Sequence, residues 1–104
     1  MIPGPWAVRF LTRRGRVPFR ESMTALDEPG RRAVYQRVDR MRAGNFGDHR
    51  DVGGGVWELR IHHGPGYRVY YAPEAGRVVV LLCAGLKRTQ DGDIARARLL
   101  WGAR

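Results

Sequence analysis

The central stretch of the chain, residues 55–90, reads GVWELRIHHGPGYRVYYAPEAGRVVVLLCAGLKRTQ. It predicts three short strands in a meander, because Gly64-Pro65-Gly66 and Pro73-Glu74-Ala75-Gly76 are strong turn sequences between apolar runs. The third strand, from Val78 to Cys83, is apolar without alternation. A strand covered on both faces has this pattern, so we expect it in the middle of the sheet.

The first two strands of the meander alternate, and side chains in a strand point alternately to its two faces. Their apolar sides carry Trp57, Leu59, Ile61, Tyr67, Val69 and Tyr71. Their other sides carry Glu58, Arg60, His62, Arg68 and Tyr70. We therefore expect one apolar face that must be covered and one open polar face, with Lys87, the only lysine, at its rim.

Helical patterns lie on both sides of this meander. Pro18 suits the first turn of a helix that runs to about Leu26. Asp27-Glu28-Pro29 begins a second helix, which Gly44 ends. Both helices have apolar residues spaced i, i+4, i+7, which gives each a single apolar stripe for the sheet. These residues are Phe19, Met23 and Leu26 in the first helix and Val34, Val38 and Met41 in the second.

The remaining segments complete the predicted topology. Trp6 to Leu11 can form an opening strand, and the polar, glycine-rich segment from Asn45 to Gly55 is expected to be a loop. Thr89 is expected to cap a last helix from about Gln90 to Trp101. The predicted fold is thus a single α+β domain over residues 1–104, in the order β-α-α-β-β-β-α. Its small, mainly antiparallel sheet carries an N-terminal helical hairpin on one face and a C-terminal helix.

Composition limits the possible partners and compartment. The 104 residues suit one domain, and the net charge of +9 favours a nucleic acid or an acidic protein as partner. Nearly all of this charge is arginine, so an arginine-rich genome is the alternative source of the excess. Cys83 is alone and expected to be buried, and we find no secretory signal or membrane-length apolar run. These features predict a cytoplasmic protein without a membrane partner.

Several short motifs occur in a family-like order. They are GVWELRI, GPGYRVYY and the segment Gly85-Leu86-Lys87-Arg88-Thr89-Gln90-Asp91-Gly92-Asp93-Ile94, preceded by Arg14-Gly15-Arg16 with Pro18 and by Gly44-Asn45-Phe46-Gly47-Asp48. Together they resemble the RelE/ParE superfamily of toxins from type II toxin-antitoxin modules. The most similar branch is the addiction-module killer group, which includes phage-derived Gp49-like and HigB-like proteins. The resemblance extends from Trp6 to about Leu100.

The resemblance implies a RelE/ParE-like fold and a metal-independent endoribonuclease that needs no cofactor. Such toxins cleave messenger RNA, often on the ribosome, and so inhibit translation. It also implies a cognate antitoxin, in this branch usually of the helix-turn-helix type. The implied site contains Arg60 in the Glu-Leu-Arg motif, Arg68 in the Gly-Tyr-Arg motif, and Lys87 in the basic loop after the last strand.

The chemistry of RNA cleavage suits these residues. An arginine fork can hold two phosphate oxygens and keeps its charge, so Arg60 and Arg68 on neighbouring strands could clamp a phosphate, with Lys87 as a third cation. For proton transfer, His62 or Glu58 could be the base, with Lys87 or a tyrosine as the acid. Glu58 could instead pair with Arg60 or Arg68 when no substrate is bound. The residues expected to bind RNA are Tyr70, Tyr67, Arg88 and Gln90.

Two other functions remain open. A ParE-like protein would inhibit DNA gyrase without cutting RNA, because a shared fold does not determine function. A non-catalytic basic RNA-binding module would bind RNA with strong salt dependence and yield no product. His62 and His63 are not expected to form a metal pair, since neighbouring strand residues point to opposite faces.

Overall fold

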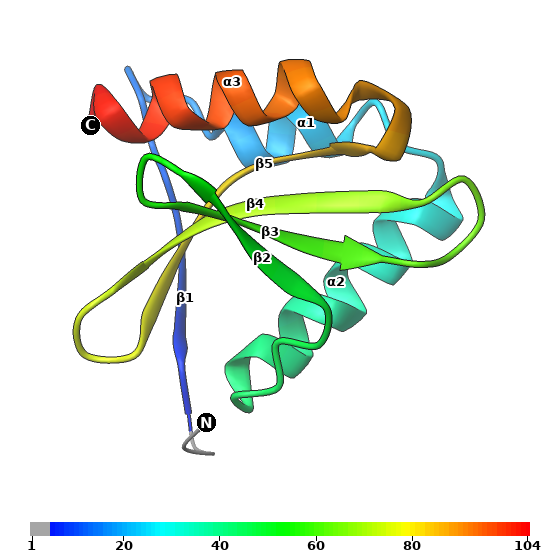
Figure 1. The fold of residues 1–104 in the computed structure, drawn as a ribbon, viewed down its shortest axis with the longest axis horizontal. Helices are drawn as coiled ribbons and strands as arrows, with labels where there is room; N and C mark the ends of the chain where they lie inside the picture. The colour runs from blue at the N-terminus through cyan, green and yellow to red at the C-terminus, as the bar shows by residue number, and fades with distance from the viewer. Residues whose placement is uncertain (1–4) are drawn as a thin grey trace.

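The computed structural model describes residues 5–104, and the first four residues of the predicted domain lie outside this range. Its centre is a five-stranded sheet in the order β1-β5-β4-β3-β2 (Figure 1). The strands are β1 (Ala7–Phe10), β2 (His49–Gly53), β3 (Val56–Ile61), β4 (Tyr67–Glu74) and β5 (Val78–Leu86). β1 is parallel to β5, and the other neighbouring pairs are antiparallel. The predicted α+β class with a mainly antiparallel sheet is therefore confirmed.

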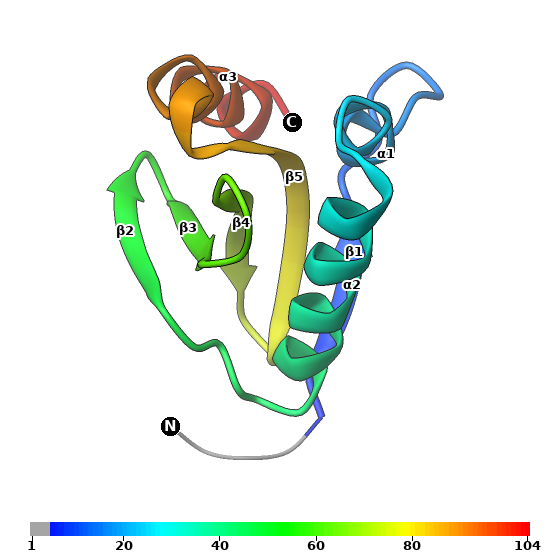
Figure 2. The same ribbon diagram turned by 90° about the vertical axis from the view of Figure 1, so that its right-hand side faces the viewer.

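Helices cover both faces of this sheet. Figure 2 shows α1 (Pro18–Met23) and α2 (Glu28–Arg42) on one side and α3 (Gln90–Gly102) on the other. A short 3-10 turn, η1 (Lys87–Thr89), links β5 to α3. The α1 and α2 side holds the larger core, formed by residues that include Phe19, Val34, Val38, Met41, Leu59 and Val69. The predicted helical hairpin is confirmed, but α1 ends at Met23, so Leu26 is buried in the connection to α2 and not in the helix.

The predicted open polar face is only partly open. Ala97, Leu100 and Trp101 of α3 are buried, and α3 packs on β4 and β5 around a second core. This core includes Val56, Tyr70, Ala72, Leu82 and Cys83. α3 covers this part of the sheet because the face that carries Glu58 and Arg68 becomes apolar farther along the strands. Burial of apolar surface away from water is favourable. Cys83 is buried as expected, and burial raises its pKa to about 12.

The predicted meander is confirmed. β5 lies between β1 and β4, and Arg60 of β3 is directly opposite Arg68 of β4. The predicted loop from Asn45 to Gly55 is wrong, because it contains β2, which pairs with β3 at the edge of the sheet. Charged side chains are common on edge strands, so the sequence HRDVG lacks the alternation that identifies a strand.

α3 begins at Gln90 as predicted, but the expected side-chain cap is wrong. Thr89 does not cap the helix with its side chain; its hydroxyl donates to Asp93 Oδ2 at 2.6 Å and accepts from the Leu86 amide at 3.2 Å.

In residues 5–104 no helix is both long enough and apolar enough to cross a bilayer.

Candidate active site

A buried carboxylate, Glu58 of β3, is the centre of the polar half of the face that α3 partly covers. The side chain is fully buried. Its Oε1 accepts hydrogen bonds from Arg50 Nε at 3.0 Å and Arg60 Nε at 3.1 Å. Its Oε2 accepts from Gln90 Nε2 at 2.8 Å and the Tyr70 hydroxyl at 3.1 Å. Each carboxylate oxygen therefore accepts two hydrogen bonds, and the four donors come from β2, β3, β4 and α3.

These bonds determine the charge of Glu58. Burial is the largest single influence and would raise the pKa of Glu58, but the hydrogen bonds from Gln90, Arg50, Arg60 and Tyr70 together outweigh it and hold the pKa below its usual value. An ionised, fully hydrogen-bonded carboxylate is a poor proton acceptor. Glu58 thus fits the pairing alternative better than the predicted role as base, with Arg68 Nε as a further cation at 3.9 Å.

Arg68 of β4 is the least satisfied polar group of this site. It is 4% exposed, and its Nη1 donates to the Tyr67 carbonyl at 3.0 Å. Its Nε is buried and has no hydrogen-bond partner in the part of the chain that the structure describes. Leaving a buried donor unpaired costs about 1–3 kcal/mol, and a charged one more. This Nε faces Glu58 Oε2 at 3.9 Å, and the side chain of Arg68 also lines a cavity, where its guanidinium is a candidate for binding an anion.

A cavity of about 300 Å³, here called the turn cavity, brings three of the predicted residues together. Arg68, Lys87 and His62 line it with His63 and the turn Gly64-Pro65-Gly66. Gly66 has φ +86°, and a Cβ there would lie 3.2 Å from Lys87 Cβ and 3.6 Å from Arg68 Nη1. The glycine therefore lets Lys87 pack closely against the turn. Arg60 is not among the residues that line this cavity.

His62 has a partner that the sequence analysis missed. Its Nε2 lies 2.7 Å from Asp48 Oδ2, which leaves Nδ1 without this contact. The hydrogen bond from His62 is the main cause that lowers the pKa of Asp48, and the charges of Arg60 and Arg68 add to it. A carboxylate bonded to one imidazole nitrogen orients the ring and supports proton transfer at the other. Asp48 occurs in the GNFGD motif, which was the available signal.

The two tyrosines expected to contact RNA are buried. Tyr67 is 2% exposed on the α2 side and donates to Asp27 Oδ1 at 2.9 Å. Tyr70 is fully buried and donates to Glu58. Burial is the main cause that raises the pKa of both hydroxyls. Burial leaves little ring surface for a base and makes either hydroxyl a poor acid, so the expected contact of these tyrosines with RNA stays a prediction.

Two other predicted RNA contacts lie near α3. Arg88 is exposed and lines, with Lys87 and Gln90, a separate cavity of about 380 Å³. Gln90 is tied to Glu58 rather than free for a ligand. Arg50, which donates to Glu58, was not among the predicted site residues. It lies in β2, and the sequence did not predict this strand.

The glycine of the G-x-K segment has a steric role. A Cβ at Gly85 would collide with the Asp93 carboxylate, which Thr89 also contacts. Gly85 is also the cross-strand neighbour of Arg68. The segment thus lets α3 come close to β5 beside Arg68, which positions Gln90 over Glu58.

Fold and site together describe a small α+β protein with a basic cavity at the turn between β3 and β4, which Arg68, Lys87 and two histidines line. Residues 21–99 match the family model described as phage derived protein Gp49-like, so the chain belongs to the Gp49-like family. It is also 53% identical over 67 residues to an uncharacterized protein of Haemophilus influenzae. That match covers 64% of this chain and 68% of the relative.

Proposed function

We propose that this chain is the toxin of a type II toxin-antitoxin module and acts as an endoribonuclease on messenger RNA. The observation that carries the proposal is the buried Arg68, which lines a cavity together with Lys87 and His62 and whose Nε makes no hydrogen bond within residues 5–104. Membership in the Gp49-like family and the resemblance to HigB-like RelE/ParE toxins support it.

The proposed reaction is attack of a ribose 2′-oxygen on the adjacent phosphorus, with departure of the 5′-oxygen of the next nucleotide. It leaves a cyclic phosphate on one product and a 5′-hydroxyl on the other. Arg68 and Lys87 would stabilise the extra negative charge on the phosphate oxygens as the new bond forms. This electrostatic contribution needs no metal ion.

Two protons must move in the same step. His62, which contacts Asp48 through Nε2, would take the proton of the 2′-hydroxyl, and Lys87 would protonate the leaving oxygen. Glu58 would act indirectly, as the counter-charge that holds Arg60 and Arg50 in place.

The proposed partners follow from the same reading. The net charge of +9 suits messenger RNA and the ribosome, and inhibition of translation would take place in the cytoplasm. A cognate antitoxin, of the helix-turn-helix type, would silence the toxin. These assignments rest on charge and on the resemblance.

Induced expression followed by primer extension on an abundant messenger RNA tests the proposal. The parent should create new 5′ ends within minutes. Arg68→Ala should lose about 10²–10³-fold of the activity, as expected for a charge-stabilising donor. His62→Ala should lose about 10²–10⁴-fold. Arg9→Ala, which removes one exposed arginine from β1, is the matched control and should cut like the parent.

Lys87→Ala is a second test of the site that does not depend on correct folding of the Arg68 variant. Lys87 is exposed, so its replacement should leave the fold intact while cleavage falls. Full cleavage by both variants would overturn the site assignment. Growth arrest with intact message and DNA damage signalling would favour gyrase inhibition instead. RNA binding without arrest or products would favour a non-catalytic RNA-binding module.

A further inference from the structure

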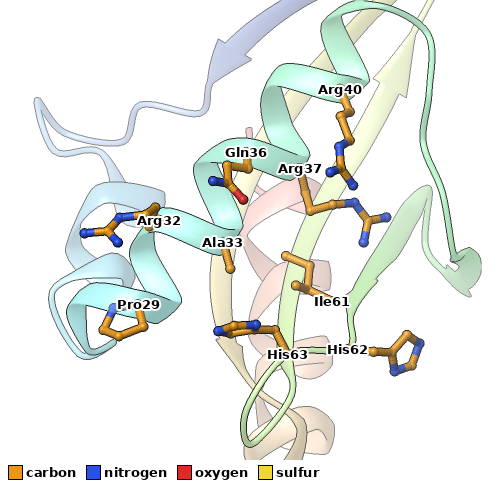
Figure 3. Close-up of a pocket in the computed structure, with 9 residues that line it drawn as sticks. All are labelled: Pro29, Arg32, Ala33, Gln36, Arg37, Arg40, Ile61, His62 and His63. Carbon is orange, nitrogen blue, oxygen red and sulfur yellow. The ribbon is translucent and has the colours of Figure 1, made fainter.

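A second basic cavity lies between α2 and the end of β3, on the α1 and α2 side of the sheet. This α2 cavity has a volume of about 410 Å³, within the range of about 300–1,000 Å³ typical of small-ligand sites. The residues drawn in Figure 3 line it, and they include Arg32, Arg37, Arg40, His62 and His63. No carboxylate of residues 5–104 is part of this lining.

Two arginines give the α2 cavity a fixed positive charge. Arg37 donates from Nη1 to the Arg60 carbonyl and from Nη2 to the Phe46 carbonyl, each at 3.1 Å. Figure 3 shows the guanidinium groups of Arg37 and Arg40 on the same side of α2. Burial and then the charge of Arg40 lower the pKa of Arg37, while Asp48 acts in the opposite direction. The two like charges repel each other, and an anion between them would relieve the repulsion.

The other arginine of the lining is not part of this pair. Arg32 donates to Glu28 Oε1 at 2.9 Å, and in Figure 3 its side chain points away from Arg37 and Arg40. Arg40, by contrast, is exposed and makes no ion pair within residues 5–104. Arg40 is therefore the cation that is most available to a ligand.

The same cavity also offers flat and apolar surface. Ala33 and Ile61 line it between the arginines and His63. The His63 ring stacks on Tyr67, with 6.4 Å between ring centroids and 26° between planes. This contact helps to fix the orientation of the His63 ring. Single-stranded nucleic acids are bound by this combination of arginine for the phosphate and a ring for the base.

His62 and His63 line both the α2 cavity and the turn cavity, so the two cavities meet at these residues. We propose that the α2 cavity is a second nucleotide subsite, in which Arg40 and Arg37 hold a phosphate of single-stranded RNA and His63 packs on a base. The inference rests on the proposed function, since the scissile phosphate would lie in the turn cavity. The shared histidines would let one RNA strand extend through both cavities, and the ring of His63 suits a base, which favours RNA over an acidic protein segment.

The test measures binding of RNA that cannot be cut. Fluorescence anisotropy would use a labelled 2′-O-methyl ten-nucleotide strand and a trinucleotide of the same chemistry. Arg40→Ala should weaken binding of the ten-nucleotide strand at least about tenfold, as expected for the loss of a charged hydrogen bond. The slope of log affinity against log salt should fall by about 0.7. Binding of the trinucleotide should change much less.

Arg9→Ala is the matched control, because it removes the same charge from an exposed position of β1. An Arg40→Ala variant with the parent's affinity and salt slope would overturn the subsite. So would binding of a glutamate-rich peptide that depends on Arg40 while RNA binding does not. Failure of the proposed function would look different. If the parent cuts no messenger RNA but still needs Arg40 to bind RNA, the subsite is supported and the nuclease activity is contradicted.

Discussion

At the scale of single residues, Glu58 shows how one buried charge organises a site. A carboxylate withdrawn from water needs close cations and donors, or its ionised form becomes too costly. Glu58 has four hydrogen bonds, from residues that lie 2 to 32 positions away in the chain. Its partners include Arg60, which connects the network to Arg37 through the Arg60 carbonyl. The carboxylate therefore links the candidate site to α2.

This network predicts a pH-dependent stability. The folded protein lowers the pKa of Glu58, so the ionised carboxylate stabilises the fold above the unfolded pKa of about 4.3. That contribution is lost as the pH falls through the folded pKa. Glu58→Gln should cost about 3 kcal/mol at neutral pH, because it leaves the arginines without a counter-charge. Below about pH 4.3 the difference from the parent should shrink.

Thermal unfolding from pH 7 to pH 3 measures this effect. Glu28→Gln is the control, since Glu28 forms an exposed pair with Arg32 and should change the profile little. Parallel pH profiles for the parent and Glu58→Gln would contradict the assigned charge of Glu58.

At the scale of elements, the first turn of α2 is bound to β4 by close packing. Asp27 accepts from the Gly30 amide at 2.8 Å and from the Tyr67 hydroxyl at 2.9 Å, so one carboxylate caps the helix and holds the strand. The Tyr67 ring lies directly against Gly30, where a Cβ would be 2.5 Å from Tyr67 Cε1. This contact leaves no room for a larger residue.

Two glycines at equivalent helix positions should respond in opposite ways to alanine. Gly30 and Gly92 are each the third residue of their helix, α2 and α3. Gly30→Ala should destabilise the protein by about 1–3 kcal/mol, because the added methyl group collides with Tyr67. Gly92→Ala meets nothing within 4 Å and should stabilise it by up to about 1 kcal/mol through helix propensity. Urea unfolding midpoints compare the two, and equal shifts would contradict the packing argument.

At the scale of the whole molecule, α3 divides the second face of the sheet into a core and a site. Ala97 and Trp101 bury the apolar half, and Gln90 at the other end of the helix contacts Glu58. Arg98 also donates to the Val52 carbonyl, which fixes the β2–β3 hairpin to the helix. Docking of α3 and assembly of the Glu58 network are therefore coupled.

Trp101→Ala tests this coupling. Trp101 is 8% exposed, and its truncation should cost about 3–5 kcal/mol. Because the helix loosens, the cleavage activity of the proposed nuclease should fall along with stability. Leu99→Ala, at a position that is 72% exposed on the same helix, should stay within about 0.5 kcal/mol of the parent. Urea unfolding and primer extension on both variants provide the readout, and unchanged stability in Trp101→Ala would contradict the described packing.

Local patterns were sufficient to predict much of this protein. The meander, the apolar faces of the two helices and the placement of Arg60 and Arg68 on one face of neighbouring strands follow from strand alternation, turn residues and i, i+4, i+7 spacing. Each of these signals depends on neighbours within a few residues, so it can be read without the fold. The same patterns predicted Arg68 and His62 on one face of the sheet, with Lys87 at its rim. All three residues line the turn cavity.

Long-range contacts determined the rest. The edge strand β2 has no alternation of its own and forms by pairing with β3, so Arg50 could not be assigned to Glu58 in advance. The burial of Tyr70 depends on where α3 docks, and the Asp48–His62 contact joins residues 14 positions apart. Polar and apolar side chains alternate along β3, but only tertiary packing determines which polar side chains are buried and which stay exposed.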